Sequence, residues 1–313
     1  MAMSAATPIS ISVNFDSLNE AFGFPKGFTD PSFFRGFDRV VELLAKRGLT
    51  ATFFVIGRDL EDPETRDRVR AWHRAGFEIG NHSYSHPMNL GALQRDDIAF
   101  EVERSHALIA ETTGDAPEGF IAPSWSNSRA LVEVLMRLGY TYDTSHFPSA
   151  MLLPLSCRVA LNHRRDKDRW YRAIHRKDWL AWATKPRLPF RVPGQHDREN
   201  DLIVFPLPSR GRFTIPNWHT KGFFLGWDRH YRELEKLAAT HPYLYYLIHP
   251  GDFVGAEDLE GSPYAHSLER MSLPLKEKLA RLDEAFSVLA AAGREARSMA
   301  GMARHFANAS AAP

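Results

Sequence analysis

Strand-like runs alternate with helix-like segments along most of this chain, and polar residues follow several of the strand-like runs. Alternating or short apolar runs predict strands at 9–15, 50–56, 77–80, 119–122, 140–142, 202–206 and 243–248. Helical periodicity, closed in places by glycine, predicts helices at 31–46, 63–75, 95–113, 128–138, 227–239 and 273–292. Such spacing suits βα units with parallel strands, so we expect an α/β fold of the distorted (β/α) barrel type.

The length of 313 residues, with 44% hydrophobic and 25% charged residues, fits one large domain without disulfide staples. We therefore expect a single domain over 1–313. The regular alternation stops at about residue 149, so residues 150–200 are interpreted as an insertion or subdomain within it. The last ten or so residues are small and rich in alanine, and we expect them to fray.

Two histidines, His82 and His86, lie four residues apart directly after the predicted strand 77–80. On a helical turn such residues share a face, so both rings could reach one metal ion, and Asn81 and Ser83 could fix the backbone there. The alternative is a pair of exposed histidines beside Pro87.

Further polar residues at strand ends complete a possible site. Asp16 follows the first strand, Asp143 the fifth and His249 the last. In α/β barrels this end of the strands is where active sites are built. Asp16, His82 and His86 would leave room for water on a catalytic zinc ion. His249 could protonate a leaving amine, with Asp143 orienting it, which describes a metal-assisted amide or ester hydrolase.

These segments occur in the order of five motifs, and the chain resembles the polysaccharide deacetylases of carbohydrate esterase family 4, with the NodB-like fold. The matching stretches are Asn14-Phe15-Asp16-Ser17, His82-Ser83-Tyr84-Ser85-His86, Gly119-Phe120-Ile121-Ala122-Pro123-Ser124-Trp125, Tyr142-Asp143-Thr144-Ser145 and Leu247-Ile248-His249-Pro250. The resemblance covers roughly residues 9–150 and 200–290.

The resemblance implies a metal-dependent hydrolase that removes an N-acetyl or other small N-acyl group from a sugar or polysaccharide precursor by attack of metal-bound water. It implies a divalent metal, Zn²⁺, held by Asp16, His82 and His86, with His249, Asp143 and Asp16 as catalytic residues. Contacts with the substrate are expected from Asn14, Pro123, Ser124, Trp125 and Ser145.

The first motif offers one carboxylate where the family has two, and Ile121 stands where the third motif has an arginine that holds the base. The fourth motif continues with His146-Phe147 instead of Asp-Trp. In one register Asp16 is the metal ligand and Asn14 replaces the base; in the other Asp16 is the base and Ser17 replaces the ligand. We prefer the first, because a buried arginine without its carboxylate is costly, so joint loss of both is coherent.

If Asn14 replaces the base, Glu20, His146 or His249 itself could accept the proton of the water. Two other functions stay open. One is hydrolysis of a cyclic amide or formamide by the same fold, as in allantoinase-like relatives, and the other is a carbohydrate-binding protein that has lost its catalytic base. His219, His230 and His241 lack partners at ligand spacing and are expected on the surface.

Residues 158–191 interleave basic and aromatic side chains. They could face an anion, such as a lipid headgroup or a lipid- or nucleotide-linked sugar, and so make peripheral membrane contact. Alternatively, they form a solvated insertion whose tryptophans pack on the barrel. The net charge of +1 argues against nucleic acid as a partner. The sequence does not indicate an oligomeric state.

The N-terminal residues 1–8 have no secretory signal pattern, and no apolar run is long enough for a transmembrane helix. The single cysteine, Cys157, excludes an internal disulfide and fits a reducing compartment; a packing role is expected for it. We therefore expect a cytoplasmic protein.

Overall fold

The structure is a computed structural model, and it describes residues 7–16, 34–162, 164, 166–194, 201–259 and 273–310. The strands are β1 (Ile9–Phe15), β2 (Ala51–Val55), β3 (Glu78–Asn81), β4 (Gly119–Phe120), β5 (Tyr142–Asp143), β6 (Phe190–Val192), β7 (Leu202–Val204) and β8 (Leu244–Ile248). The helices are α1 (Phe34–Lys46), α2 (Pro63–Arg74), α3 (Arg95–Thr113), α4 (Arg129–Arg137), α5 (Leu152–Asn162), α6 (Lys167–Ile174), α7 (Ala181–Thr184), α8 (Lys221–Leu225), α9 (Trp227–Thr240), α10 (Leu275–Ala291) and α11 (Met299–Ala309).

The strands form an eight-stranded sheet in the order β6-β7-β5-β4-β3-β2-β1-β8. The β1–β8, β3–β4, β4–β5 and β5–β7 pairs are parallel, and only β6 is recorded as antiparallel to its neighbour, β7. Helices connect most of the parallel strands, which confirms the predicted α/β class. Contacts within the chain divide it into two compact units, residues 1–53 with 217–313 and residues 54–216.

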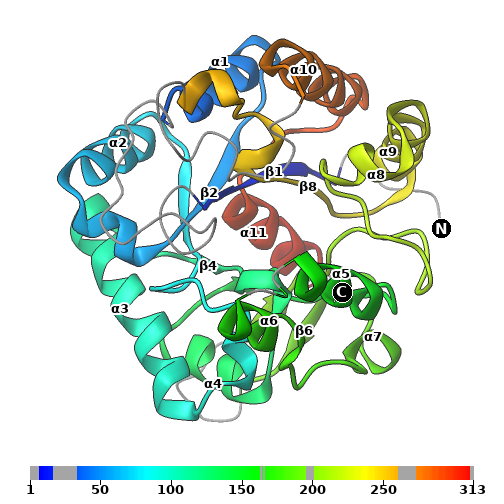
Figure 1. Cartoon of the computed structure of the whole chain (residues 1–313). Coiled ribbons are helices and arrows are strands. Elements are labelled where there is room, and N and C mark those ends of the chain that lie inside the picture. The colour runs from blue at the N-terminus through cyan, green and yellow to red at the C-terminus, as the bar shows by residue number, and fades with distance from the viewer. Residues whose placement is uncertain are drawn as a thin grey trace. The chain divides into compact units, whose positions relative to one another are not determined.

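The first unit contains the parallel ladder between β1 and β8. Figure 1 shows β1 and β8 side by side, with Ile9 opposite Leu244 and Val13 opposite Ile248. Every residue of both strands is buried, as expected for parallel strands that are covered on both faces. On α1, the ring of Phe37 packs 4.4 Å from that of Phe15, measured between ring centres, which closes one face of β1.

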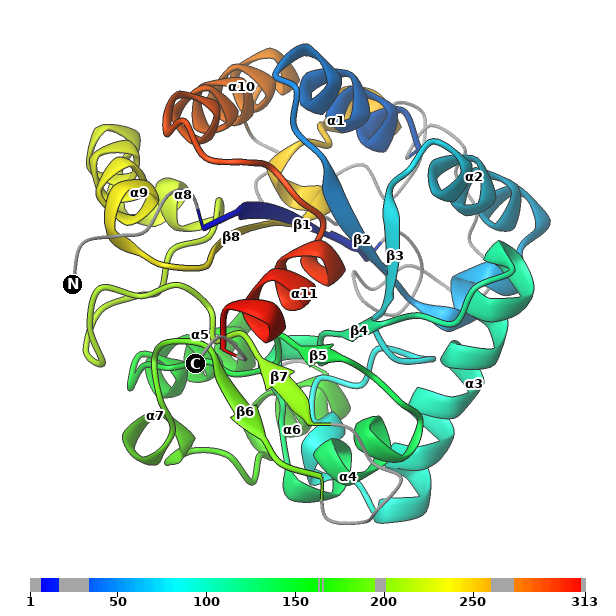
Figure 2. The same cartoon turned by 180° about the vertical axis from the view of Figure 1, so that it is seen from behind.

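The second unit carries the shorter strands β3, β4, β5 and β7, with β6 at the edge (Figure 2). Its core lies between α3, α4 and the sheet, around the buried side chains of Val102, Phe120, Leu135 and Tyr140. Because β4 and β5 are each only two residues long, the loops that follow them begin close to the core.

Local signals explain where the predicted helices begin and end. The side chain of Asp62 caps α2 by accepting a hydrogen bond from the Thr65 amide at 2.8 Å, and Ser128 caps α4 in the same way. Gly114 ends α3 with a φ of 89°, a left-handed conformation that favours glycine. The predicted helix 31–46 begins at Phe34 among the described residues, since residues 31–33 lie outside them.

The predicted insertion, residues 150–200, contains α5, α6, α7 and strand β6 in its described part. Its side chains are mixed in environment: Trp170 is exposed, whereas Trp179 and Trp182 are half-buried. Cys157 lies exposed on α5, so the expected packing role of this thiol is wrong. Whether residues 1–313 behave as a single domain with an insertion stays a prediction.

The C-terminal segment does not fray as expected, because it forms α11 up to Ala309. Met299 and Met302 on this helix are fully buried, and α11 contacts β1 within the first unit. The segment before the helix pairs with the start of β1: the Arg297 amide donates to the carbonyl of Ile9 at 2.9 Å. A search of the described helices finds none with the length and apolar character needed to cross a membrane.

Candidate metal centre

Hydrogen bonds hold the end of β3 in place. They fix the start of the loop 82–86, which carries His82 and His86 and is named the two-histidine loop. The buried amide nitrogen of Asn81 donates to the carbonyl of Val102 at 3.1 Å and to the hydroxyl of Tyr140 at 2.7 Å. Its side-chain oxygen accepts from the Ser83 amide at 2.8 Å. The prediction that Asn81 and Ser83 fix this backbone is therefore confirmed.

The two histidine rings come together, though not on the helical turn that their spacing suggested. Residues 82–86 form an irregular loop in which Ser83 and His86 have left-handed φ values of 66° and 57°. The rings of His82 and His86 lie 4.8 Å apart between centres, at 71° to each other. Their closeness thus depends on an unusual backbone conformation, which costs free energy at non-glycine residues.

A buried glutamate in the same unit supports this loop. Glu101 on α3 accepts hydrogen bonds from the Ser85 amide at 2.8 Å and from the Ser85 hydroxyl at 2.6 Å. The side chain of Ser83 in turn accepts from the His86 amide at 3.2 Å. Sequence reasoning missed Glu101, since it lies in a helix with no motif around it.

The hydrogen bonds of His82 determine which ring nitrogen can bind a metal. His82 is buried, and its Nδ1 lies 2.7 Å from the carbonyl oxygen of Ile121. A carbonyl oxygen can only accept, so Nδ1 carries the hydrogen and Nε2 keeps its lone pair. Histidine ligands of metals are commonly oriented by such a second hydrogen bond.

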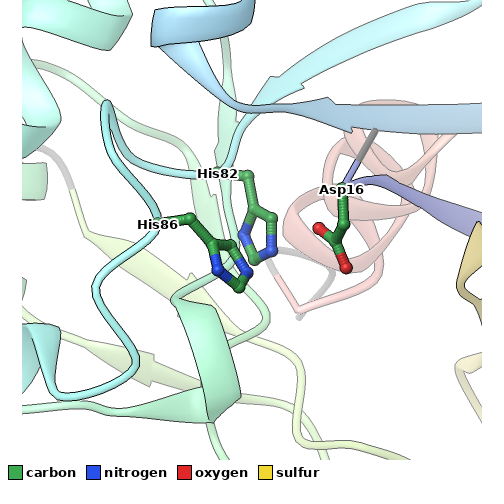
Figure 3. A group of neighbouring side chains, drawn as sticks. All are labelled: Asp16, His82 and His86. Atoms are coloured by element: carbon green, nitrogen blue, oxygen red, sulfur yellow. The ribbon is translucent and has the colours of Figure 1, made fainter. Parts of the chain in front are cut away.

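Asp16 follows β1 directly and is buried, with 5% of its surface exposed. One ligand atom each from Asp16, His82 and His86 lie within 4.8 Å of one another, and Figure 3 shows the three side chains. Two imidazole nitrogens and a carboxylate oxygen form a donor set that suits zinc and leaves coordination positions for water or substrate. The residues present therefore fit the metal that the sequence predicted.

Asp143, at the end of β5, is buried and accepts several hydrogen bonds. The Ser145 amide donates to its Oδ1 at 2.9 Å, the Ser145 hydroxyl donates to the same oxygen, and Asn127 donates to Oδ2 at 3.2 Å. Burial raises the pKa of the Asp143 carboxyl, and the bonds from Ser145 and Asn127 oppose that shift. Ser145 also accepts from the Ala122 amide at 2.7 Å, so it joins the loops after β4 and β5.

The loop after β4, residues 121–127, contains two non-glycine residues with left-handed backbone, which the sequence motif does not predict. Ser124 and Trp125 have left-handed φ values of 51° and 54°, next to the buried Pro123. Both are half-buried, as a residue that contacts substrate would be. The predicted substrate contacts of these residues, of Ser145 and of the buried Asn14 stay predictions.

His249 follows β8 and is only half-buried. Its backbone amide donates to Oδ2 of Asp252 at 2.9 Å, and the hydroxyl of Thr220 donates to Oδ1 of the same carboxylate at 3.0 Å. Asp252 was missed in the sequence, although its position three residues after His249 is a typical signal for a capped turn.

Of the three candidates for the base, His146 is the one that the structure argues against. Burial and the nearby cations Lys185 and Arg212 lower the pKa of His146 to about 3, so its imidazole is a weak proton acceptor. The third candidate, Glu20, lies outside the described residues, as does Ser17 of the alternative register.

The expectation of surface positions for His219, His230 and His241 is wrong, since all three are buried. The hydroxyl of Tyr246 lies 2.8 Å from Nδ1 of His219 and 2.7 Å from Nε2 of His230. Burial in the core lowers the pKa of His230 to about 3. Histidine spacing alone carries no information on burial, which is why the sequence did not indicate this.

A cavity of about 450 Å³ lies beside the two-histidine loop, within the second unit. Ser85 and Pro87, which flank His86, contribute to its wall. The remaining lining residues are Asn89, Leu93, Asp97, Phe100, Glu101, Asp168, Tyr171 and Arg172. The rings of Phe100 and Tyr171 are about half exposed, at 55% and 50%.

Comparisons with known proteins agree with the motifs. Residues 11–142 match the family model described as polysaccharide deacetylase. The chain is 32% identical over 176 residues to a peptidoglycan deacetylase of Helicobacter pylori, a match that covers 55% of this chain and 52% of that protein. The chain thus spans about half the length of this curated relative.

Solved structures show the same fold. A Mycobacterium smegmatis protein assigned to the polysaccharide deacetylases superposes with a TM-score of 0.59 at 18% identity, over 99% of this chain and 93% of that one. The allantoinase PuuE superposes with a TM-score of 0.59 at 14% identity, over 96% and 90% of the two chains. The predicted NodB-like fold is confirmed, and residues 11–142 of the chain match the polysaccharide deacetylase family model.

Proposed function

We propose that this protein is a metal-dependent hydrolase that removes an N-acetyl, or another small N-acyl, group from a sugar or glycan. The observation that carries the proposal is the pair His82 and His86, brought together with Asp16 in a set of possible metal ligands. All three lie within the residues that match the family model. The peptidoglycan deacetylase of Helicobacter pylori supports a glycan as the substrate.

Asp16, His82 and His86 would hold the ion, which favours the register in which Asp16 is a ligand. When bound, a divalent ion such as Zn²⁺ polarises the acyl carbonyl and lowers the pKa of water. The Ile121 carbonyl keeps Nε2 of His82 available by holding the hydrogen on Nδ1. The buried carboxylate of Asp16 would balance part of the charge of the ion.

His249 is the group that we assign to proton transfer. Its side chain is half-buried, and the bond from its backbone amide to Asp252 fixes the start of the turn that carries it. One of its ring nitrogens would deliver a proton to the leaving nitrogen of the amide. Asp143 would orient the ring of His249 and favour its protonated form.

The proton of the attacking water needs an acceptor, because Asn14 stands at the position of the family's base. His146 is a poor candidate, given the low pKa of its imidazole. We therefore assign both steps to His249, which would accept the proton first and deliver it later.

The cavity beside the two-histidine loop supports a sugar substrate. Aromatic rings such as those of Phe100 and Tyr171 can pack against the C–H face of a pyranose, and carboxylates such as Asp97 can accept bonds from its hydroxyls. A lipid- or nucleotide-linked precursor, membrane contact through residues 158–191 and a cytoplasmic location stay predictions.

The test combines metal analysis with product release. Purified wild type, His82→Ala, His249→Ala and the control His73→Ala are loaded with zinc, dialysed and analysed for metal. Each protein is then assayed for acetate and formate release from N-acylated sugars and glycan fragments. Allantoin is assayed separately by the disappearance of its ring, because opening a cyclic amide releases neither acid. His73 is the matched control because its ring is on the surface, paired with Asp115 at 3.0 Å.

We expect about one zinc per chain in the wild type, His249→Ala and His73→Ala, and none in His82→Ala. Acetate release should fall by about 10²- to 10⁴-fold in His249→Ala, the usual contribution of a general acid or base. Wild type without stoichiometric zinc would exclude the proposed centre. Zinc binding without turnover of any substrate would contradict the proposed hydrolase and leave a binding role, and turnover of allantoin alone would identify a cyclic-amide hydrolase.

A further inference from the structure

One arginine of the basic aromatic segment is not on the surface. Arg176 follows α6, and only 1% of its side chain is exposed, whereas neighbouring Arg172 and Lys177 are exposed. A buried guanidinium is costly unless its charge is paired and its N–H groups are hydrogen-bonded. The partners of Arg176 therefore indicate what it does.

The guanidinium of Arg176 binds the strained loop after β4 directly. Its Nη1 donates to the carbonyl of Ser124 at 2.7 Å, and its Nη2 donates to the carbonyl of Trp125 at 2.9 Å. These are the two residues of that loop with left-handed φ. Such a conformation persists only where the surroundings hold it, and Arg176 provides two of the bonds that do so.

The same guanidinium forms a two-point ion pair with Asp178, which extends the network toward β5. Nε and Nη2 of Arg176 lie 2.9 and 2.8 Å from the two carboxylate oxygens of Asp178. Asp178 also accepts from the backbone amide of Asn127 at 3.1 Å. The side chain of Asn127 donates to Oδ2 of Asp143 at 3.2 Å.

We propose that Arg176 and Asp178 are positioning residues, supplied by the inserted segment, which hold the loop 123–127 and through Asn127 the carboxylate of Asp143 for catalysis. The inference rests on the proposed function, in which Asp143 orients His249. The third motif lacks its usual arginine, because Ile121 stands there, and Arg176 reaches the same loop from a distant part of the sequence. The predicted insertion, residues 150–200, would therefore support the site as well as form part of the surface.

Four variants test this in the zinc-loaded full chain. Arg176→Gln removes the positive charge and the two parallel hydrogen bonds to Asp178. Arg176→Lys keeps the charge but cannot form both of these bonds at once. The double variant Arg176→Gln with Asp178→Asn leaves no uncompensated buried charge. It should therefore fold better than Arg176→Gln alone. Arg164→Gln is the matched control, because Arg164 lies exposed in the same segment.

Three measurements are made on each variant: kcat and KM for the substrate that the acetate assay identifies, bound zinc, and amide hydrogen exchange of peptides that cover residues 122–128. We expect kcat to fall about 100-fold in Arg176→Gln and in the double variant, with KM changed less than about threefold, since displacement of a catalytic group mainly affects the chemical step. Arg176→Lys should be intermediate and Arg164→Gln unchanged. Zinc should stay at the wild-type level, and exchange should rise in 122–128 alone.

A kcat for Arg176→Gln within twofold of the wild type would overturn the inference, as would a rise in exchange spread evenly over the chain. If the wild type has no turnover, the proposed function fails separately, and exchange then decides the anchoring role: faster exchange confined to 122–128 supports it, and unchanged exchange overturns it.

Discussion

Two side chains at the candidate site, those of His82 and Arg176, are oriented in part by main-chain carbonyls. His82 is oriented by the carbonyl of Ile121, at the position where the family's third motif has arginine. A backbone carbonyl is present whatever side chain occupies that position, so the change to isoleucine leaves the orientation of His82 intact. Arg176 likewise contacts two carbonyls of the next loop. Motif departures of this kind alter side chains without removing the backbone groups that orient a ligand.

The buried histidine His230 predicts a pH dependence of stability. Its pKa falls from 6.5 to about 3 on folding, because burial disfavours the charged ring and His219 and Lys221 add to this. The unfolded chain therefore binds more protons between these two values. Stability from His230 is fully present above pH 6.5 and is lost as the pH falls toward 3, by up to about 1.4 kcal/mol per pH unit.

Urea unfolding of the wild type and of His230→Phe between pH 7 and pH 4 checks this. The variant should lose less stability on acidification, with a slope lower by about 1 kcal/mol per pH unit. Equal slopes for the wild type and His230→Phe would show that His230 does not titrate in this way.

How well the sequence predicts a residue depends on whether its role is local. The motif pattern selected Asp16, His82 and His86 as candidate ligands, because the ends of neighbouring parallel strands bring such residues together. The burial of His219 and His230 around Tyr246 depends on contacts between distant segments. The sequence also did not predict the left-handed conformation of Ser83 and His86, because neither residue is a glycine.

Helix α6 is the element of the predicted insertion that contributes residues to the wall of the cavity beside the two-histidine loop. It contributes Asp168, Tyr171 and Arg172 to the cavity beside the two-histidine loop. The segment directly after it carries Arg176, which binds the loop after β4. α6 thus has exposed side chains at the cavity, whereas Arg176, two residues after the helix ends, is buried. The basic residues of this segment therefore lie in two environments: Arg172 is exposed at the cavity, and Arg176 is buried.

Loss of the ring of Tyr171 on α6 should weaken substrate binding. The ring is half exposed at the cavity and would pack against a sugar. In Tyr171→Ala we expect KM to rise about 10-fold with kcat almost unchanged, because the ring contacts the substrate equally in its ground and transition states. The control Trp170→Ala changes an exposed aromatic residue of the same helix that does not line the cavity. A larger fall in kcat than rise in KM for Tyr171→Ala would contradict this role.

Elements with strong local signals were predicted to within a few residues, and the others were not. α3 runs over Arg95–Thr113 as predicted, because a glycine ends it and a long stretch without proline precedes that glycine. α6 and α7 are short and mixed in polarity, so periodicity could not reveal them. For α11, alanine-rich composition indicated fraying, whereas burial of Met299 and Met302 stabilises the helix through tertiary contacts.

For the whole molecule, metal binding should contribute to stability as well as to chemistry. An ion that binds the native state and not the unfolded chain stabilises it by about 2.7 kcal/mol when its concentration is 100 times the Kd. For a chain of this size that corresponds to roughly 5 °C in Tm. We expect a chelator to lower the Tm of the wild type by this amount and to leave that of His82→Ala unchanged.

Differential scanning calorimetry with and without chelator measures this directly. His73→Ala serves as the control that should respond like the wild type. A wild-type Tm that does not change on chelation would show that no ion binds preferentially to the folded state. The test needs no substrate, so it is independent of whether hydrolysis is detected.

Four non-glycine residues in the described part of the chain have left-handed backbone, and they lie in the loops after β3 and β4: Ser83, His86, Ser124 and Trp125. Glycine at Ser83 or Ser124 would relieve this strain, yet it would also let the loops leave the shape that presents ligands and substrate contacts. Selection for heat resistance alone should therefore enrich glycine at such positions, while selection for turnover should retain the native residues. In these two loops, thermal stability and the proposed catalytic activity would therefore favour different residues.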